Sequence, residues 1–474
     1  MVNARVLPRL LPPTFNPWRP ADPDRAVAVL MSGGVDSSVT ALLLKQEGWD
    51  AVGVTMRIPM ADGCRSPRPC CGWEAATVCS RIGLPHYFID TAESFEARVV
   101  IPFRDAYARG ATPNPCMDCN TSLKFDLVWD ALEREWGPCR VATGHYARIV
   151  GAGPTARLAR AADPQRDQSY FLYGIPPGRL PRVLFPLGDR RKDAVRRLAH
   201  AAGLPTAERP DSMDLCFAGE GDYRSALGPG SIPAEGPILD ESGRELGRHN
   251  GIGNFTPGQR QGLGIAAREP LYVLRIDAAR NAVIVGLREA ALVSVVCAGE
   301  VRVLVTPPPA ADTPMLGRIR SQGDYAPCRV EACGPGGLRV RFDRPVFAPA
   351  PGQHLVVYDT DGTVAAGGVI RAEQADHAAG DWTGGRPKSL SENLSVGPRP
   401  CEGGKPAPTT GRKERAQAPG DASLRRSWGR GPAGEPGKET EAGYAESRAH
   451  NRCRATPPGA AAAGRSQERF SDGL

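Results

Sequence analysis

Apolar residues between positions 25 and 214 follow two spacings, one typical of buried strands and one typical of helices. Ala26–Met31 and Ala51–Ile58 are short, nearly continuous apolar runs, as expected of buried strands. Between them, Ser37–Glu47 carries apolar residues at helical spacing and ends before Gly48, a helix stop. A strand, a helix and a strand within about 33 residues have the size of one βαβ unit.

The same alternation continues along this segment. The pattern predicts further helices at Trp73–Ile82, Ser122–Glu135 and Asp189–Ala202, with Asp189 as N-cap, and further strands at His86–Asp90 and Arg140–Thr143. Strands that alternate with helices favour a mostly parallel sheet covered on both faces. We therefore expect a Rossmann-like α/β catalytic domain over residues 25–214.

The pattern changes after Cys216. Residues 215–290 are rich in glycine and turns, with short β-like runs, and are assigned to a small central domain. Residues 291–372 contain short apolar strands separated by Pro and Gly turns, which predicts a C-terminal β-barrel or sandwich.

The two ends of the chain lack this order. Residues 1–24 are Pro-rich and are expected to form a flexible arm. Residues 373–474 have few branched or aromatic side chains, so they bury too little surface to offset conformational entropy and are expected to be disordered. A weak electrostatic tether to RNA and an extension without function both fit this tail.

Composition narrows the class of protein. The 474-residue chain has 13 cysteines, and it is too long to need the disulfide framework of a small secreted domain. It shows no signal-peptide pattern and no apolar run of about 18 residues that could span a bilayer. We expect a soluble cytoplasmic protein with reduced thiols and no membrane contact. The formal charge of +7 is compatible with a polyanionic partner.

The segment Ser32-Gly33-Gly34-Val35-Asp36-Ser37-Ser38 lies between the first predicted strand and its helix. Its glycines let backbone N–H groups close on phosphate oxygens, and the helix N-terminus adds partial positive charge. Asp36 suits a Mg²⁺ ligand better than a phosphate contact. The loop has no lysine and is therefore not a Walker A site. It resembles the loop of the PP-loop ATP pyrophosphatases, which implies cleavage of ATP between the α and β phosphates.

A second motif, Thr112-Pro113-Asn114-Pro115-Cys116-Met117-Asp118-Cys119, places two thiols just before the predicted helix Ser122–Glu135. A thiolate at a helix N-terminus is stabilised by the helix dipole, which suits a sulfur nucleophile. Cys216 lies in a polar loop much later in the chain. One activated oxygen and two separated thiols suggest sulfur delivery, in which one cysteine carries a persulfide and the other helps to release its terminal sulfur.

The remaining cysteines are assigned no chemistry. A free cysteine usually packs as a small buried hydrophobe, and this is expected of Cys64, Cys79, Cys139, Cys297, Cys328 and Cys333. The pair Cys70-Cys71 stays open. A structural zinc site typically needs two paired motifs, and only one C-x-x-C occurs, so zinc is not expected.

Four more segments follow in order. They are Ala142-Thr143-Gly144-His145-Tyr146, Arg166-Asp167-Gln168-Ser169-Tyr170-Phe171-Leu172, Leu184-Phe185-Pro186-Leu187-Gly188 and Thr256-Pro257-Gly258-Gln259-Arg260-Gln261-Gly262-Leu263-Gly264. Together with the loop and the cysteine motifs, they resemble the bacterial tRNA-specific 2-thiouridylase (tRNA-uridine 2-sulfurtransferase) family over about residues 25–372.

The resemblance implies an ATP-dependent reaction on the tRNAs for Lys, Glu and Gln. Oxygen O2 of the wobble uridine, U34, is adenylated and replaced by sulfur, giving 2-thiouridine, AMP and pyrophosphate. A sulfur-relay protein or a cysteine desulfurase is implied as the persulfide donor. By position, Cys119 resembles the nucleophile and Cys216 the persulfide carrier, and the two are implied to form a transient disulfide.

The same resemblance implies the binding residues. An ATP site, with Mg²⁺ as cofactor, is implied at Leu30, Met31, Ser32, Gly33, Gly34, Val35, Asp36, Ser37, Met56 and Gly144. Contacts with tRNA are implied at Asn114, Pro115, Cys116, His145, Arg166, Asp167, Gln168, Arg320, Ser321 and Gln353. Arg166 and Gln168 carry the donors that phosphates and base edges need.

Two positions depart from the family pattern. Many members have an Asp, thought to transfer protons, where this chain has Cys116, so Asp118 or water would have to take that role. Alternatively, Cys116, Cys119 and Cys216 could supply three thiolates to an iron–sulfur cluster whose open iron carries sulfur. The pair Arg320-Ser321 stands where Arg-Tyr is expected.

Other functions stay open from the residues alone. A different PP-loop enzyme, such as a tRNA lysidine synthetase or a small-molecule amidating ligase, would not need the two thiols. An inactive RNA-binding protein would need neither the thiols nor Ser32 and Asp36. The basic run with Arg190, Arg191, Lys192, Arg196 and Arg197 fits either an RNA backbone or a solvated helix face.

Overall fold

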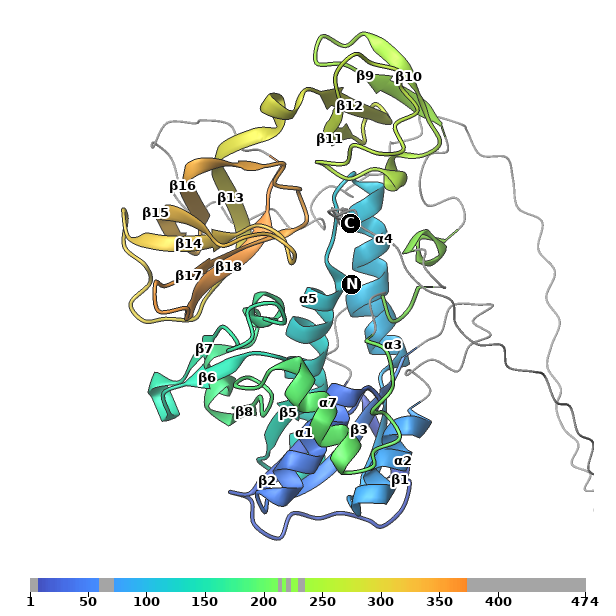
Figure 1. Ribbon diagram of the computed structural model, residues 1–474, viewed down its shortest axis with the longest axis vertical. Coiled ribbons are helices and arrows are strands. Elements are labelled where there is room, and N and C mark those ends of the chain that lie inside the picture. Colours follow the sequence, from blue (N-terminus) through green and yellow to red (C-terminus); the bar gives the residue numbers. More distant parts are fainter. Residues whose placement is uncertain (1–6, 59–71, 212–214, 219–222, 229–234, 373–474) are drawn as a thin grey trace, which may run out of the picture. The chain divides into compact units, whose positions relative to one another are not determined.

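A computed structural model describes residues 7–58, 72–211, 215–218, 223–228 and 235–372. The tail expected to be disordered, and Cys64, Cys70 and Cys71, lie outside these ranges. Within them, no helix is both long enough and apolar enough to cross a membrane. The described chain comprises an α/β domain, a small β-rich domain and a β-barrel (Figure 1).

A six-stranded sheet forms the framework of the α/β domain, in the order β1-β4-β3-β2-β5-β8. All its strands are parallel except β1, which pairs antiparallel with β4. The strands are β1 Arg9–Pro13, β2 Ala26–Leu30, β3 Asp50–Arg57, β4 His86–Asp90, β5 Arg140–Thr143 and β8 Val183–Leu184. The strand order reverses between β2 and β5, which is where ligands of open α/β sheets usually bind.

Helices cover both faces of this sheet because alternate residues of a strand point to opposite sides. Val27 and Val29 of β2 belong to one core, with residues of α1, α2 and α7. Ala28 and Leu30 belong to another, with residues of η2, α4, η3 and α6. The helices are α1 Val35–Gln46, α2 Trp73–Ile82, α3 Ala92–Phe95, η2 Glu96–Val100, α4 Ile101–Ala108, α5 Pro115–Asp118, η3 Cys119–Val128, α6 Trp129–Trp136 and α7 Lys192–Ala201. The expected Rossmann-like arrangement is confirmed.

Helix α1 begins at Val35, two residues before the predicted Ser37, and two other helices begin further from their predicted positions. The one expected at Ser122–Glu135 begins at Pro115, and α5, the π-helical η3 and α6 form one uninterrupted run. Proline suits a first helical position because its missing N–H would be unpaired there anyway. Helix α7 begins at Lys192 and has Arg191, not Asp189, at its N-cap.

The expectation of a flexible arm at residues 1–24 is wrong for the part that the structure describes. Residues 9–13 form β1 at the edge of the sheet, the position in which a Pro-rich strand is tolerated. Trp18 is buried, and its indole Nε1 donates to Asp50 Oδ1 at 2.6 Å. The arm therefore completes the sheet, because β4 would otherwise present an unpaired edge.

The two remaining domains are mostly β-structure. The central sheet has the order β10-β9-β12-β11, with β9 Gly236–Leu239, β10 Glu245–His249, β11 Tyr272–Asp277 and β12 Ala282–Gly286. The C-terminal strands form a closed barrel, which decides between the barrel and sandwich alternatives. They are β13 Leu292–Val303, β14 Pro314–Arg318, β15 Ala326–Gly334, β16 Gly337–Phe347, β17 His354–Tyr358 and β18 Val364–Ile370.

Short elements complete the described chain. Strands β6 Arg148–Val150 and β7 Arg157–Ala159 form a hairpin after β5. The 3₁₀ turns are η4 Gly153–Thr155, η5 Ser169–Leu172, η6 Pro177–Arg182, η7 Tyr223–Ala226, η8 Ile252–Asn254 and η9 Arg288–Ala291. As expected, Cys79, Cys139, Cys297 and Cys328 are buried, whereas Cys333 is half-buried.

Candidate active site

The phosphate loop joins β2 to α1 at the point where the strand order reverses. Gly33 has φ +75°, a left-handed conformation that favours glycine. The hydroxyls of Ser37 and Ser38 donate to the Gly34 carbonyl at 3.1 and 2.8 Å, which holds the loop against the first turn of the helix. Ser32 is exposed beside them. Loop N–H groups and the N-terminus of a 12-residue helix make an anion site.

The loop after β5 approaches the phosphate loop closely. A Cβ atom added to Gly144 would lie 2.8 Å from the backbone nitrogen of Ser37 and 2.8 Å from the carbonyl carbon of Asp36. Only glycine allows this approach of two main chains. Met56, near the end of β3, is half-buried. The structure therefore brings Gly144 to the loop, as the resemblance implies.

Asp36 is engaged by a lysine that the sequence pattern did not single out. Lys192 Nζ lies 2.7 and 2.9 Å from the two carboxylate oxygens of Asp36, and the Tyr146 hydroxyl donates to the same carboxylate at 2.9 Å. The Lys192 side chain is only 11% exposed. It belongs to the basic run assigned either to RNA or to solvent, and neither assignment holds for this side chain. The signal in the sequence that could have indicated this role was the position of Lys192 at the start of α7, soon after the Leu184–Gly188 segment.

The same lysine reaches the segment that leads to Cys216. Lys192 Nζ lies 2.8 Å from Asp211 Oδ1, and Asp211 also pairs with Arg166 and Arg196, each at 2.9 Å. Burial by itself raises the pKa of Asp211, but the hydrogen bond and charge of Lys192, with the two arginines, bring it below its usual value. Two carboxylates and three cations thus link the phosphate loop to residue 211.

Cys119 lies one turn inside the helix rather than at its N-terminus. It is 8% exposed, and burial raises the pKa of its thiol, an effect that the charge of Lys124 opposes and that of Asp118 reinforces. The expected lowering by the helix dipole is not seen, because the helix begins four residues earlier at Pro115. At rest Cys119 is therefore a thiol.

Lys124 is a second residue that the sequence pattern missed. It lies five residues after Cys119 within the π-helical η3, whose i→i+5 hydrogen bonds bring residues five apart towards one face. Its Nζ is held at 3.0 Å from Asn120 Oδ1. It is the cation that acts on the thiols of both Cys116 and Cys119. In an α-helix, by contrast, residues five apart such as Cys119 and Lys124 point to different faces.

Asp118 and Cys116 lie one and three residues before the nucleophile candidate, Cys119. Burial, with repulsion from Glu300 of the barrel strand β13, raises the pKa of Asp118 to about 7. Cys116 has an exposed surface, yet the surrounding protein, followed by the negative charge of an ionised Cys119, raises its pKa to about 11. Asp118 is therefore the group beside Cys119 that exchanges a proton near neutral pH.

Cys216 lies in a described stretch of four residues, 215–218. It is exposed, whereas the next residue, Phe217, is buried and meets the rings of Phe95 and Phe103 at 5.6 and 5.4 Å between centroids. The transient disulfide between Cys119 and Cys216 stays a prediction. Across the described ranges, no three Cys, His, Asp or Glu side chains are grouped closely enough to hold a metal ion. The three-thiol cluster alternative therefore has no support in this arrangement.

The residues implied to contact tRNA are dispersed, and some are already engaged. Asn114 and Pro115 lie at the start of α5. Gln168 Oε1 accepts a hydrogen bond from the Tyr146 N–H at 2.9 Å. Arg320 Nη2 donates to the carbonyls of Phe347 and Ala348 at 2.7 and 2.9 Å, and Ser321 accepts a hydrogen bond from Arg318 at its carbonyl. Gln353 Nε2 donates to the main chain before α5.

Asp167 is not accessible to RNA in this structure. Its side chain is fully buried and binds the Ser169 hydroxyl at 2.9 Å, the Tyr325 hydroxyl, and Arg318 at 3.5 Å. Arg318 and Tyr325 belong to the barrel, so Asp167 joins the α/β domain to the barrel. The contact of Asp167 with tRNA stays a prediction, and in this structure the side chain binds Arg318 and Tyr325 of the barrel.

His145 is neutral. Burial, with the charge of Lys124, lowers its pKa to about 3. One ring nitrogen lies 2.7 Å from the Thr143 hydroxyl, and the ring lies between Phe125 and Phe185, with centroids at 6.5 and 6.3 Å. His145 can therefore present an aromatic face to a base but not a charge to a phosphate.

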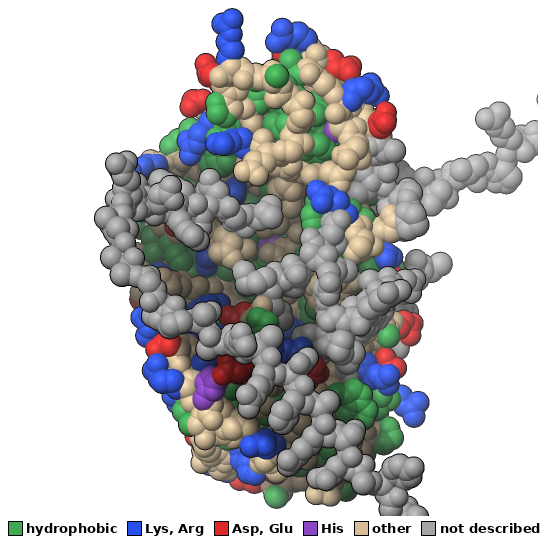
Figure 2. Space-filling view, turned by 45° about the vertical axis from the view of Figure 1, so that its right-hand side comes forward, with side chains coloured by type: hydrophobic (Ala, Val, Ile, Leu, Met, Phe, Trp, Pro, Cys, Tyr) green, Lys and Arg blue, Asp and Glu red, His purple; other side chains and the backbone are tan. Residues whose placement is uncertain are grey.

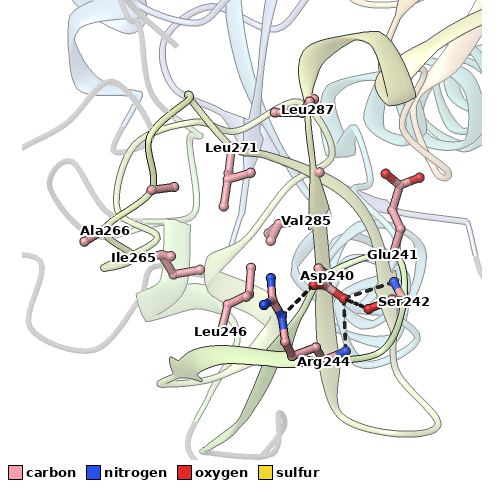
Figure 3. A pocket seen from close by; sticks show the side chains of 12 residues that line it. Asp240, Glu241, Ser242, Arg244, Leu246, Ile265, Ala266, Leu271, Val285 and Leu287 are labelled. Carbon is pink, nitrogen blue, oxygen red and sulfur yellow. Dashed lines mark hydrogen bonds and ion pairs between the residues drawn. The ribbon is translucent and has the colours of Figure 1, made fainter.

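The face drawn in Figure 2 shows Lys and Arg side chains interspersed with Asp and Glu among the described residues. A pocket of about 470 Å³ opens elsewhere, in the central domain, and it is lined by Leu246, Leu271 and Val285 together with the ion pair of Asp240 and Arg244 (Figure 3). None of the predicted site residues lines this pocket.

Models of three protein families match successive stretches of the chain. A tRNA methyl transferase HUP domain matches residues 25–220, a tRNA methyl transferase PRC-barrel domain residues 229–287, and an aminomethyltransferase beta-barrel domain residues 294–370.

Two curated relatives are similar over most of their own length. The tRNA-specific 2-thiouridylase MnmA 1 of Syntrophus aciditrophicus is 44% identical over 360 residues, covering 75% of this chain and 94% of the relative. The tRNA-specific 2-thiouridylase MnmA of Roseiflexus castenholzii is 42% identical over 365 residues, covering 72% and 98%. A solved structure of the U34-tRNA thiolase NcsA from Methanococcus maripaludis, with its 4Fe-4S cluster, is 17% identical, covers 40% of this chain and 61% of that one, and has a TM-score of 0.26, too weak a similarity to bear on function. The identity to the first two relatives, over nearly their whole length, shows that the chain belongs to the tRNA-specific 2-thiouridylase family.

Proposed function

We propose that this protein is a cytoplasmic enzyme that converts the wobble uridine, U34, of tRNA to 2-thiouridine, using ATP and a persulfide. The observation that carries the proposal is the meeting of the phosphate loop, Gly144 and Lys192 at the switch point of the sheet, in a chain of the thiouridylase family. The tRNAs for Lys, Glu and Gln are the proposed substrates, and a sulfur-relay protein or cysteine desulfurase the proposed donor.

The residues at the loop fit the phosphates of ATP. Gly33 adopts the left-handed conformation that the loop needs, and Gly144 packs directly against the main chain of Asp36 and Ser37, with no room for a Cβ atom. Arg209 Nη1 donates to the Gly33 carbonyl at 3.2 Å, which adds a cation beside the loop. The Asp36 carboxylate, which binds Lys192 here, is the oxygen ligand beside the loop that would hold a Mg²⁺ ion, and that ion would neutralise the departing pyrophosphate.

The first step activates the base. Oxygen O2 of U34 attacks the α-phosphorus of ATP, the bond to the β-phosphate oxygen breaks, and pyrophosphate leaves. Carbon C2 of the base then carries an adenylated oxygen, which is a good leaving group. The positive end of α1 and the side chain of Lys192 stabilise the charge that develops on the phosphates.

The second step delivers sulfur. The terminal sulfur of a persulfide on Cys216 attacks C2 of the base, and AMP leaves with the former O2. The Cys119 thiolate then attacks the inner sulfur of Cys216 and breaks the S–S bond, so the sulfur stays on the base and a Cys119–Cys216 disulfide forms. Two electrons from an external thiol reduce this disulfide for the next turnover.

Asp118 supports this step in place of the missing family Asp. Cys119 rests as a thiol and must lose a proton before it attacks. Asp118 precedes it directly, and its pKa of about 7 suits proton transfer near neutral pH. Cys116, with a pKa raised to about 11, does not suit that role. Lys124 stabilises the thiolate once formed.

The proposed tRNA contacts divide into two kinds. Asn114, Pro115 and Cys116, at the start of the nucleophile helix, are proposed to face the target base, with Cys116 exposed and Pro115 buried. His145 is proposed to stack on a base as a neutral ring. Arg166, with a side chain 45% exposed, is proposed to bind a phosphate. Gln168, Arg320 and Ser321 stay candidates whose polar groups also bind the protein itself.

The deciding experiment supplies purified protein with ATP, Mg²⁺, a persulfide donor and unmodified tRNA-Glu. Mass spectrometry of the digested tRNA should detect 2-thiouridine, together with AMP and pyrophosphate in solution. Cys119→Ser and Cys216→Ser should abolish sulfur incorporation, whereas Cys333→Ser, a half-buried barrel thiol, should not. No added sulfur with wild-type protein would refute the proposal, and full activity of both serine variants would indicate a different PP-loop chemistry.

The iron–sulfur alternative has its own readout. Protein purified without oxygen should contain no iron or acid-labile sulfide and should be colourless. Stoichiometric iron that disappears in Cys116→Ser would instead support the three-thiol cluster and replace the persulfide step proposed above.

A further inference from the structure

One turn of the barrel, residues 350–353, contacts the segment that precedes α5. Gln353 Nε2 donates to the carbonyl of Thr112 at 3.0 Å and to that of Pro113 at 3.4 Å. In the opposite direction, the Thr112 N–H donates to the Pro351 carbonyl at 2.7 Å. These bonds run both ways between two stretches of main chain, so they fix the orientation of the segment as well as its distance.

The contact leaves no room for a side chain at Gly352. This residue has φ +89°, and an added Cβ would lie 3.1 Å from Ala111 Cβ and 3.1 Å from the backbone nitrogen of Thr112. The turn is itself fixed to the barrel, because the Ile370 N–H donates to the Gln353 carbonyl at 2.7 Å. A closed barrel therefore supports the segment firmly.

The contact between the barrel and Thr112 also constrains the helix that carries Cys119. Pro113 and Pro115 both have a φ fixed by the proline ring, which limits the freedom of the chain between Thr112 and the start of α5. Cys116 and Cys119 occupy the first two turns after Pro115. A displacement of Thr112 therefore moves the first turns of the helix rather than being absorbed by a flexible loop.

The next barrel residue, His354, is connected to the helix through Tyr170 and Phe171. The Tyr170 hydroxyl donates to the His354 carbonyl at 2.9 Å, and the adjacent Phe171 carbonyl accepts a hydrogen bond from Asn120 Nδ2 at 3.0 Å. Asn120 follows Cys119 directly. Tyr170, His354 and Asn120 are all buried, so water does not compete for these bonds.

We propose that the barrel positions the Cys119 thiol, with Gln353 as the positioning residue before the helix and the His354–Tyr170 contact as a second support at Asn120. Gln353 acts through the main chain of Thr112 and Pro113 and not on the tRNA. The proposal rests on the proposed function in one respect, the assignment of Cys119 as the nucleophile. Positioning matters because a displacement of about 1 Å in a reacting group can lower a rate by roughly 100-fold.

A direct contact between Gln353 and tRNA predicts different results. It would raise the KM for tRNA and leave Cys119 unchanged when no tRNA is present. The positioning role predicts altered Cys119 reactivity without any substrate, and a lower kcat at nearly constant KM.

The first test measures the alkylation of Cys119 by iodoacetamide in the full chain, without ATP or tRNA, by mass spectrometry of timed digests. Gln353→Ala, and Gln353→Glu, which keeps the shape but loses the donor, should raise the alkylation rate roughly tenfold, the effect of about one net hydrogen bond. Gly352→Ala should act in the same direction. Buried Cys79, in the other core, is the internal reference.

Gln259→Ala provides the matched control. It removes a side-chain amide that also bridges main-chain groups, accepting from Thr256 N at 3.1 Å and donating to Gln261 O at 2.9 Å, but in the central domain. Its Cys119 alkylation rate should equal that of the wild type. A parallel rise at Cys79 in both Gln353 variants would mean general loss of folding and would overturn the proposal.

The second test is steady-state thiolation of tRNA by the same variants. Gln353→Glu should lower kcat by roughly 10- to 100-fold and change the KM for tRNA less than twofold. A higher KM with unchanged Cys119 alkylation would overturn the proposal in favour of a tRNA contact. If the wild-type protein adds no sulfur to tRNA, the proposed function fails, yet the alkylation rates still decide whether the barrel positions Cys119.

Discussion

Lys192 offers the sharpest test of how the phosphate loop is organised. Lys192→Met keeps the length and packing of the side chain but removes the charge that Asp36 and Asp211 share. Removing one partner of a fully buried ion pair costs roughly 3–5 kcal/mol. Here the carboxylates are 31% and 22% exposed, and Asp211 keeps Arg166 and Arg196. We therefore expect a loss of about 2 kcal/mol, or a fall in Tm of about 5 °C.

The effect on ATP should be of similar size. Without Lys192, the Asp36 carboxylate presents an unpaired negative charge beside the phosphates. Two unit charges 4 Å apart repel by about 4 kcal/mol near a protein surface, and about half of this remains at a partly exposed site. A penalty of about 2 kcal/mol corresponds to a roughly 30-fold higher KM for ATP.

The assay is tRNA-dependent release of pyrophosphate at varied ATP concentration, with thermal unfolding measured in parallel. Arg197→Met is the matched control, because it lies on the same helix and its partner Asp193 is exposed to solvent. It should change neither the KM for ATP nor the Tm. If Lys192→Met shows the ATP dependence and Tm of the wild type, the reasoning is refuted, and the loop does not depend on this ion pair.

Three further changes test other parts of the site. Gly144→Ala should abolish pyrophosphate release while the protein stays folded by circular dichroism, because the new Cβ would lie 2.8 Å from the Ser37 nitrogen. Asp118→Asn should raise the Tm at pH 8, and this gain should shrink towards pH 4. The folded-state pKa of Asp118 is about 7, so the wild-type carboxyl is neutral at low pH and becomes a buried, destabilising charge as the pH rises through 7. Asparagine stays neutral at both pH values. The same variant should lose any inflection of kcat near pH 7. Arg318→Met, which leaves the buried Asp167 without its cation, should cost about 3 kcal/mol and separate unfolding of the barrel from that of the α/β domain in calorimetry.

The fold was predictable where its signal is local. The strand Ala26–Leu30 and the helix after it follow from a short apolar run and a periodic one, and the register of β2 between β3 and β5 agrees with the predicted βαβ order. The start of the nucleophile helix was not predictable in this way. Proline is compatible with both an extended segment and a first helical turn, and neighbouring residues do not decide between them.

The same distinction between local and long-range signals applies to the candidate site. The glycines and serines indicate an anion-binding loop by their own chemistry, and the cysteines indicate a pair of thiols. The phosphate loop and the Cys119 motif were therefore recognisable without knowledge of the tertiary structure. What each charged group does depends on its distant neighbours. Asp36 and Lys192 are 156 residues apart, and Asp167 and Arg318 are 151 apart, so no local pattern links them.

By itself, therefore, the sequence determined the alternation of strands and helices, the anion-binding loop and the identity of the thiols, because each depends on residues adjacent in the chain. Only the tertiary structure decided which groups are charged and which are accessible. Lys192 turned inward to Asp36, Asp167 became a buried link to the barrel, and Cys119 became a thiol with a raised pKa one turn inside its helix. Distant segments that pack together bury some side chains and bring charged groups close to one another. Burial and these nearby charges set the pKa of a group, the partner of an ion pair and the access of a nucleophile to its substrate.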